Sequence, residues 1–355
     1  MKMTFRWYGD KADTISLNQI RQIGYVKGII STLYDIPAGE VWPRERIHAL
    51  KAEVEAEDLT LEGIESVNIH DDIKIGLPSR DKYIENYIKT LEALGEEGIH
   101  LVCYNFMPVF DWTRTDLRKP RPDGSTVMAY DQKYIEGKNP LEFAEEIRKN
   151  SLGHDMPGWE PERLSHVLDL FEAYKDVDEN KLFDNMVYFL KAIGPVCEKY
   201  DMKMAVHPDD PAWPVFGLPR IVRSKETIAK ILKAVDKPYN GLTFCAGSLG
   251  TNPKNDLPGI IRSFPGRIHF AHVRNLHHFA PGVFEEAVHL SSDGSFDLYE
   301  ICKALYDIHF EGPIRPDHGR NLWGEQCMPG YGLYDRALGA AYICGLWEAI
   351  EKSNR

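Results

Sequence analysis

The chain alternates between short apolar segments and longer amphipathic ones, and this rhythm is the feature that most restricts its fold. Eight apolar segments have the composition of strands, at residues 3–8, 26–32, 64–69, 100–106, 203–206, 241–245, 268–273 and 312–316. Helical patterns separate most of them, at residues 14–23, 40–58, 79–94, 224–235, 257–264 and 296–308, and a final one covers 333–352. This order predicts an α/β fold, a (β/α)8 TIM barrel that forms a single domain over residues 1–355. A doubly wound open sheet is the alternative, and no glycine-rich phosphate fingerprint follows an early strand to favour it.

The rhythm is interrupted between the fourth and fifth predicted strands. Residues 107–202 are far more than one crossover helix needs. They contain the turn Arg121-Pro-Asp-Gly, a helix start at Asn139-Pro140, and helical patterns at 162–174 and 180–200. We expect a long helical insertion that forms a lid or one wall of a site. A surface insertion without a role is the alternative.

Charge and cysteine usage narrow the class of protein. The net charge of the 355 residues is -12 and no cluster of Lys and Arg stands out, which argues against a nucleic-acid partner. The six cysteines are scattered without a C-x-x-C pair, so a disulfide framework is not expected. The N-terminus lacks a signal-peptide pattern, and no apolar run is long enough to span a membrane. We therefore expect a cytoplasmic protein with no membrane partner.

Four consecutive strands are predicted to end on side chains that can bind a metal ion. These are His207, Cys245, His272 and Asp317, after the fifth to eighth strands. All strands of a barrel end on the face that carries the active site, so we expect the four side chains to meet there. Each has an ordinary explanation alone, as a hydrogen-bonded histidine, a core cysteine or a turn aspartate, but their recurrence favours a metal site. Carboxylate favours Mn²⁺ or Mg²⁺, and thiolate with imidazole favours Fe²⁺ or Zn²⁺, so the ligand types leave the metal open.

The last of these strand ends adds a second polar group. Asp317 and His318 are adjacent and would point to opposite sides of a strand, one to a metal and the other to a substrate. His269 has the opposite strand parity from His272 and is the weaker ligand candidate.

Six segments together resemble one enzyme family over essentially the whole chain. They are MKMTFRWYGDKADTISLNQIRQI at the start, STLYDIPAGEVW, AVHPDDPAW, FCAGSLG, HFAHVRN and RPDHGR. They resemble D-mannonate dehydratase of the bacterial hexuronate (glucuronate) pathway. The resemblance implies a barrel like that of xylose isomerase, and a lyase that removes water from D-mannonate to give 2-keto-3-deoxy-D-gluconate with Mn²⁺ or Fe²⁺. It also implies that His207, Cys245, His272 and Asp317 hold one metal ion.

The resemblance further implies that His318 and Tyr331 are the acid and base, without deciding which is which. Position along the chain is the only basis for naming residues that would bind a small sugar-acid substrate. Arg274, two residues past His272, is the candidate for its carboxylate. Candidates for its hydroxyl groups are His70, Asn105, Arg6 and Trp7. We also expect a homo-oligomer, as is common for such enzymes.

Other functions stay open at this point. An aldose–ketose isomerase usually needs a site richer in carboxylates. A barrel phosphodiesterase or endonuclease needs a larger His/Glu array. A protein that only binds a metal or a sugar acid would need the ligands but not His318.

Overall fold

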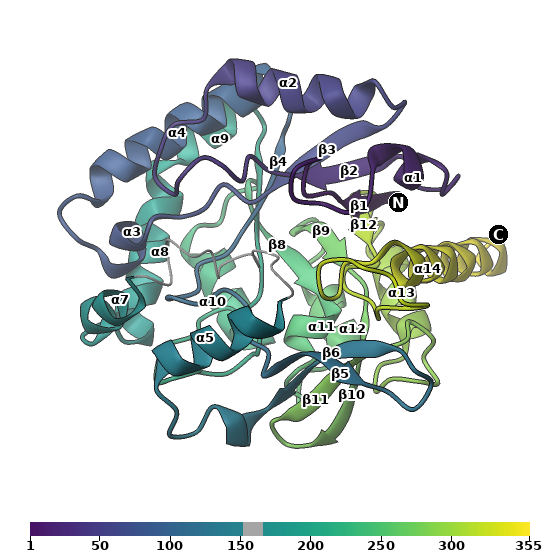
Figure 1. Cartoon of the computed structure of the whole chain (residues 1–355). Coiled ribbons are helices and arrows are strands. Elements are labelled where there is room, and N and C mark those ends of the chain that lie inside the picture. The colour runs from purple at the N-terminus through teal and green to yellow at the C-terminus, as the bar shows by residue number, and fades with distance from the viewer. Residues whose placement is uncertain (152–165) are drawn as a thin grey trace.

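The computed structural model describes residues 1–151 and 166–355. Eight parallel strands close into a barrel, in the order β1-β12-β9-β8-β7-β4-β3-β2 (Figure 1). Their bounds are β1 Lys2–Arg6, β2 Gly28–Ser31, β3 Thr60–Glu65, β4 Leu101–Tyr104, β7 Lys203–Val206, β8 Asn240–Cys245, β9 Ile268–His272 and β12 Pro313–Arg315. The prediction of a (β/α)8 barrel is confirmed, and each predicted strand overlaps one of these.

Helices surround the barrel as the outer layer. The helices outside the insertion are α1 Leu17–Arg21, α2 Arg44–Glu55, α3 Asp71–Ile75, α4 Arg80–Glu96, α10 Lys225–Ala234, α11 Ala246–Leu249, α12 Leu257–Ser263, α13 Leu298–Asp307 and α14 Leu333–Ser353. Ser224 caps α10 through a capping box, because its hydroxyl accepts from the Thr227 N–H. The short helices α3 and α11 were not predicted. No helix in the described ranges 1–151 and 166–355 is long and apolar enough to cross a membrane.

The segment between β4 and β7 is only partly helical, which corrects the prediction of a helical insertion. Its first half forms an antiparallel hairpin, β5 Asp116–Pro120 and β6 Thr126–Asp131, followed by the short helix η1 Gln132–Tyr134. Its second half contains α5 Pro140–Asn150, α7 Val167–Tyr174, α8 Glu179–Ala192 and α9 Gly194–Lys199. The predicted helix at 162–174 begins outside the described residues. The predicted helix at 180–200 is divided into α8 and α9, since α9 begins at Gly194 with Pro195 in its first turn.

The β5–β6 hairpin pairs with a second hairpin from a distant part of the chain. The predicted loop after β9 contains β10 Asn275–Ala280 and β11 Val283–Ala287, and the four strands form a sheet in the order β10-β11-β6-β5. The predicted turn does close the β5–β6 hairpin: the Gly124 N–H donates to the Arg121 carbonyl at 3.0 Å, and Gly124 has φ +84°. Figure 1 shows this sheet beside the barrel, next to α5.

The barrel interior explains why the strand ends are polar. A small cluster separate from the main core, Ile30, Leu101, Cys103, Ala205 and Phe270, fills the inside of the barrel. Side chains two residues apart on a strand point the same way, so His207 follows Ala205 and His272 follows Phe270 at the open end.

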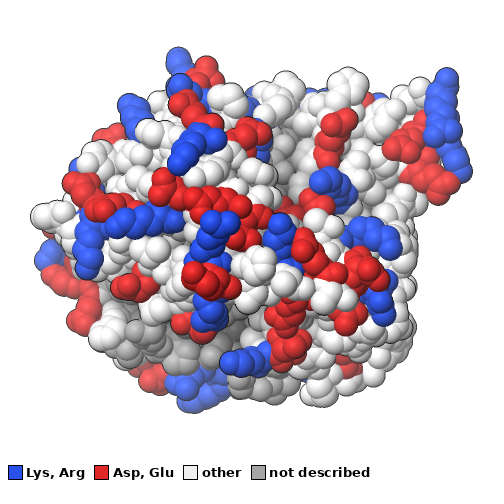
Figure 2. All heavy atoms as spheres, turned by 90° about the horizontal axis from the view of Figure 1, so that it is seen from above, with Lys and Arg blue, Asp and Glu red and all other residues white. Residues whose placement is uncertain are grey.

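On the outer surface, Lys and Arg are interspersed with Asp and Glu over the face in Figure 2.

Candidate active site

A cavity opens at the carboxyl ends of the barrel strands and contains most of the predicted site residues. Its empty volume is about 580 Å³, including space that is open to solvent. It is lined by Arg6, Tyr8, Glu65, Ser66, Cys103, Tyr104, Asn105, Met107, Asp111, Trp112, His207, Asp210, Arg274, Arg315, Asp317, His318 and Tyr331. Met107, Asp111 and Trp112 belong to the segment after β4, so part of the predicted insertion lines the cavity. We call it the catalytic cavity.

Three of the four predicted metal ligands form a compact group at its base. One ligand atom each from His207, Cys245 and His272 lies within 4.8 Å of the others. His272 is fully buried, and neither of its ring nitrogens has a hydrogen-bond partner within the described ranges. Leaving buried polar nitrogens unpaired is costly, and a bound ion would remove that cost at one of them. The trio therefore fits a divalent transition metal.

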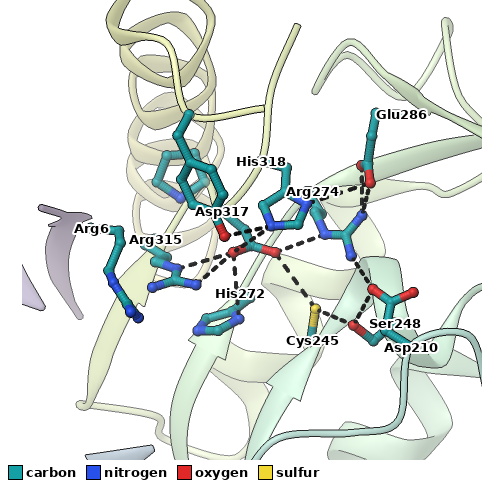
Figure 3. A network of polar contacts seen from close by, with 12 residues as sticks. Arg6, Asp210, Cys245, Ser248, His272, Arg274, Glu286, Arg315, Asp317 and His318 are labelled. Atoms are coloured by element: carbon teal, nitrogen blue, oxygen red, sulfur yellow. Dashed lines mark hydrogen bonds and ion pairs between the residues drawn. The ribbon is translucent and has the colours of Figure 1, made fainter. Parts of the chain in front are cut away.

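Asp317 lies beside this trio. Its Oδ1 is 3.6 Å from His272 Nδ1, and its Oδ2 is 3.7 Å from Cys245 Sγ. Arg274 Nε donates to Oδ2 at 2.7 Å, and Arg315 donates to Oδ1 at 2.7 Å (Figure 3). Burial raises the pKa of this carboxyl, but the surrounding histidines and arginines hold it well below its usual range. Asp317 is therefore an anion next to the trio, as a fourth ligand must be.

His207 is oriented by its own backbone. Its Nδ1 lies 2.8 Å from the Pro208 carbonyl oxygen, which can only accept, so Nδ1 carries the proton and Nε2 is left for another partner. Burial lowers the pKa of His207, but a hydrogen bond to Cys245 and the nearby acidic groups raise it to about 9. A metal ion binding here would displace a proton.

Glu65 forms a second group with Cys103 and His272 that could hold an ion. However, Arg6 and Arg315 both contact its carboxylate. Burial raises its pKa, and these two arginines lower it to about 2. The two groups share His272, and we take the trio as the candidate metal site because the Asp317 carboxylate lies beside it as a further anionic group. The sequence prediction missed Glu65 because it extended the third strand to residue 69, past the true end.

A buried network of arginines and carboxylates borders the trio (Figure 3). Arg274 donates to Asp317, to Asp210 at 2.9 Å and to Glu286 at 2.6 Å. Arg114, from the segment before β5, bridges the same Asp210 and Glu286 at 2.6 and 2.9 Å. A Cβ at Gly247 would lie 2.0 Å from Arg274 Cζ, so glycine is required where the guanidinium passes.

His318 and Tyr331 lie together on one side of the catalytic cavity. The Tyr331 hydroxyl is 2.7 Å from His318 Nε2, and His318 Nδ1 is 3.5 Å from Glu286 Oε1. Since a carboxylate only accepts, Nδ1 carries a proton, and Nε2 is placed to accept from the Tyr331 hydroxyl. Burial raises the pKa of Tyr331 to about 12.

Asp317 and His318 do not point to opposite sides, which corrects the expectation from strand parity. The strand β12 ends at Arg315, and Asp317 has φ +60°, in the left-handed region. The chain turns there, and both side chains line the catalytic cavity.

The proposed substrate-binding residues divide into two groups. Arg6, Asn105 and Arg274 line the catalytic cavity. His70 and Trp7 do not. His70 Nδ1 accepts from the Asp72 N–H at 3.1 Å at the start of α3, and its ring stacks on Tyr83 with centroids 3.6 Å apart. Trp7 is fully buried, and its Nε1–H donates to the Ile15 carbonyl at 3.2 Å. Both side chains have partners outside the catalytic cavity, and their role in substrate binding stays a prediction from the sequence.

Comparison with known proteins places this geometry in a family. The family model described as D-mannonate dehydratase (UxuA) matches residues 1–355. The mannonate dehydratase of Brachyspira hyodysenteriae is 65% identical over 355 residues, which cover 100% of both chains. The chain belongs to the D-mannonate dehydratase family. Among solved structures, mannonate dehydratase from Streptococcus suis serotype 2 aligns with a TM-score of 0.90 at 42% identity, covering 100% of this chain and 96% of that one.

More distant structures share the fold alone. A D-tagatose 3-epimerase-like protein aligns over 100% of both chains with a TM-score of 0.56 at 12% identity. The predicted barrel and the family implied by the sequence resemblance are therefore confirmed.

Proposed function

We propose that this member of the D-mannonate dehydratase family removes water from D-mannonate to give 2-keto-3-deoxy-D-gluconate, a step of glucuronate catabolism. The observation that carries the proposal is the position of the His318–Tyr331 pair in the cavity that His207 and Asp317 also line, with the buried Cys245 and His272 grouped around His207. An acid and a base next to a divalent-metal site are the parts that such an elimination needs. The identity of 65% to a named relative supports the substrate.

The reaction removes the C2 proton and expels the C3 hydroxyl group of the sugar acid. The C2 carbanion is unstable unless its negative charge is delocalised into the neighbouring carboxylate. A divalent ion on His207, Cys245, His272 and Asp317 would supply Lewis-acid stabilisation of the charge that develops on substrate oxygens. The fully buried His272 and Cys245 place that site away from bulk water, where electrostatic stabilisation is stronger.

The hydrogen bond between His318 and Tyr331 suggests which of them is the base. When the Tyr331 O–H turns from His318 Nε2 to the C3 hydroxyl group of the substrate, the Nε2 lone pair is released and takes the C2 proton. Tyr331, whose pKa is raised to about 12, keeps its proton until it transfers it to the departing hydroxyl group. His318 then returns its proton to the Tyr331 oxygen across the 2.7 Å contact. The enol product becomes the 2-keto acid, and no net proton is gained or lost.

Arg6 is a better candidate than Arg274 for the substrate carboxylate. All three nitrogens of the Arg274 guanidinium already contact Asp317, Glu286 and Asp210. Arg6 contacts Glu65 and the Tyr34 hydroxyl, which leaves two of its five N–H groups for a ligand. Asn105 is the candidate for a substrate hydroxyl. Because Met107, Asp111 and Trp112 line the cavity, we propose that the start of the 107–202 segment acts as a wall of the site.

The metal is proposed to be one Mn²⁺ or Fe²⁺ per chain. A thiolate and two imidazoles favour Fe²⁺, and the carboxylate suits Mn²⁺. A cytoplasmic location and a homo-oligomeric state stay predictions from the sequence.

The test is the product formed from each of two substrate classes. With added Mn²⁺ or Fe²⁺, the protein is expected to convert D-mannonate to the 2-keto-3-deoxy acid, detected by NMR. It should leave D-fructose and D-xylose unchanged, because the epimerases and isomerases share only its fold. Conversion of a free sugar without conversion of D-mannonate would replace the dehydratase proposal with an isomerase.

A further inference from the structure

Tyr8 is a buried tyrosine that lines the catalytic cavity, and the mechanism above does not use it. It follows β1, and its side chain is 3% exposed. Its hydroxyl oxygen is buried and makes no hydrogen bond of good geometry within residues 1–151 and 166–355, although the Tyr331 hydroxyl lies close to it. An unpaired buried hydroxyl is unfavourable in a folded protein, so its retention beside a reaction site requires a reason.

The surroundings of Tyr8 point to Tyr331. The two rings pack edge to face with centroids 5.0 Å apart. The two hydroxyl groups are close enough for each to affect the pKa of the other: Tyr8 lowers the pKa of Tyr331, and Tyr331 raises that of Tyr8. The Arg6 guanidinium lies 4.9 Å from the centre of the Tyr8 ring. Because the Tyr331 proton is directed to His318, Tyr8 would be the donor in a hydrogen bond between the two hydroxyl groups.

The Tyr331 oxygen can use such a donor. The Tyr331 hydroxyl directs its own proton to His318 Nε2 at 2.7 Å, so the lone pairs of its oxygen can accept a hydrogen bond from another group. When Tyr331 transfers that proton to the departing hydroxyl group, its oxygen becomes negatively charged until His318 returns a proton. A hydrogen bond to a charged oxygen is stronger than one to a neutral oxygen. A hydroxyl that donates to the Tyr331 oxygen while this oxygen is negatively charged stabilises the transition state more than the ground state.

We propose that Tyr8 is a positioning residue for the dehydration, whose hydroxyl donates a hydrogen bond to the Tyr331 oxygen as that oxygen loses its proton. The relay then runs from Tyr8 through Tyr331 to His318 and Glu286. This inference rests on the proposed function and adds to it a residue that follows the first strand of the barrel.

The test is a set of tyrosine-to-phenylalanine variants assayed with D-mannonate at full metal occupancy. Tyr8→Phe is expected to lower kcat about 10- to 100-fold, the range for losing a hydrogen bond to a charged group, with little change in KM. Tyr87→Phe is the matched control. Tyr87 is also a buried tyrosine, but it is not among the residues that line the catalytic cavity, and its hydroxyl donates only a long hydrogen bond, 3.4 Å, to the Val67 carbonyl. Its kcat should stay within about 2-fold of the native value.

A double variant shows whether Tyr8 acts through Tyr331. In a Tyr331→Phe background, Tyr8→Phe should cause no further loss of the residual activity, because the oxygen that it serves is gone. 3-Fluorotyrosine at position 8 keeps the hydroxyl and the packing, and should retain native kcat even where Tyr8→Phe folds poorly. An unchanged kcat in Tyr8→Phe, or an equal loss in both backgrounds, would overturn the proposal. Failure of the native protein to convert D-mannonate would instead reject the proposed function.

Discussion

Cys245 is a fully buried cysteine with polar neighbours. The Ser248 hydroxyl donates to its sulfur at 3.1 Å, and Asp317 Oδ2 is 3.7 Å away. Cysteines that only fill space usually lie among apolar side chains. The polar setting of Cys245 supports the proposal that its sulfur binds a metal ion.

Cys245→Ser is therefore expected to lose metal. A serine hydroxyl is a much weaker ligand than a thiolate for Fe²⁺ or Zn²⁺, so bound metal after dialysis should fall at least about 10-fold. Elemental analysis of the purified protein measures it. Cys344→Ser on α14 is the control, since Cys344 is only partly buried and belongs to no candidate metal group in the described ranges. Full occupancy in Cys245→Ser would make Cys245 a packing residue.

His318→Ala separates chemistry from metal binding. The His318 ring contacts Tyr331 and Glu286, and its Nε2 lies 4.0 Å from Asp317 Oδ1, but it is not one of the proposed metal ligands. We expect native metal content and a fall in kcat of at least about 100-fold, the usual contribution of one acid or base. Turnover at the native rate in this variant would remove His318 from the mechanism.

Much of the candidate site could be predicted from local sequence because the same pattern, a short apolar strand that ends on a possible metal ligand, is repeated along the chain. His207, Cys245 and His272 each follow a short apolar strand, and the barrel brings such ends together. Glu286 and Tyr8 could not be found this way. Their importance comes from partners 32 and 323 positions away along the chain, His318 and Tyr331, and no local pattern records such contacts.

At the level of elements, the hairpins β5–β6 and β10–β11 explain how the segment after β4 is attached to the barrel. Arg114 precedes β5, and Glu286 is on β11. The Arg114 guanidinium is fully buried between Asp210 and Glu286, and lies 5.1 Å from the centre of the Phe284 ring. This arginine connects the four-stranded sheet to the end of β7.

Arg114→Met is expected to destabilise the protein. It removes one partner of a buried ion pair and leaves two carboxylates with less compensation, which typically costs about 3–5 kcal/mol. Urea unfolding of the metal-free protein measures the change. Lys119→Met on β5 is the control, because its ion pair with Glu285 is partly exposed and worth less than about 1 kcal/mol. Equal losses from both substitutions would contradict a structural role for the buried pair.

The barrel strands were predictable because each is a short apolar run, whereas these hairpin strands were not. The strands β5 and β10 are polar, and their pairing joins residues 116–131 to residues 275–287. Only the turn at Arg121 to Gly124 had a local signature. A sheet formed from two distant polar hairpins is therefore visible only once the chain is folded.

At the scale of the whole molecule, the two ends of the barrel differ in their chemistry. The metal trio lies at the carboxyl ends of the strands. At the opposite end, His269 lines a second cavity with Lys2 and Lys203. Burial and the Lys203 charge lower the pKa of His269 to about 4. His269 is thus neutral in the folded protein near neutral pH.

This histidine predicts a loss of stability in mild acid. Between pH 6.5 and 4 the unfolded chain binds the His269 proton and the folded chain does not, so the free energy of unfolding falls as pH falls through this window. The contribution is on the order of 2 kcal/mol. Urea unfolding of metal-free protein at pH 7 and pH 4.5 should show a smaller drop for His269→Asn than for the native chain. The same drop in both would show that His269 does not contribute.

The central claim is that one metal ion at the converging strand ends makes the elimination possible. The most direct measurement is a titration of chelator-stripped protein with Mn²⁺ or Fe²⁺ while dehydration of D-mannonate is followed. We predict no turnover without metal, and a rise in activity that stops at one ion per chain. Full turnover by the stripped protein, or activity that keeps rising to a second equivalent, would contradict the single-ion site.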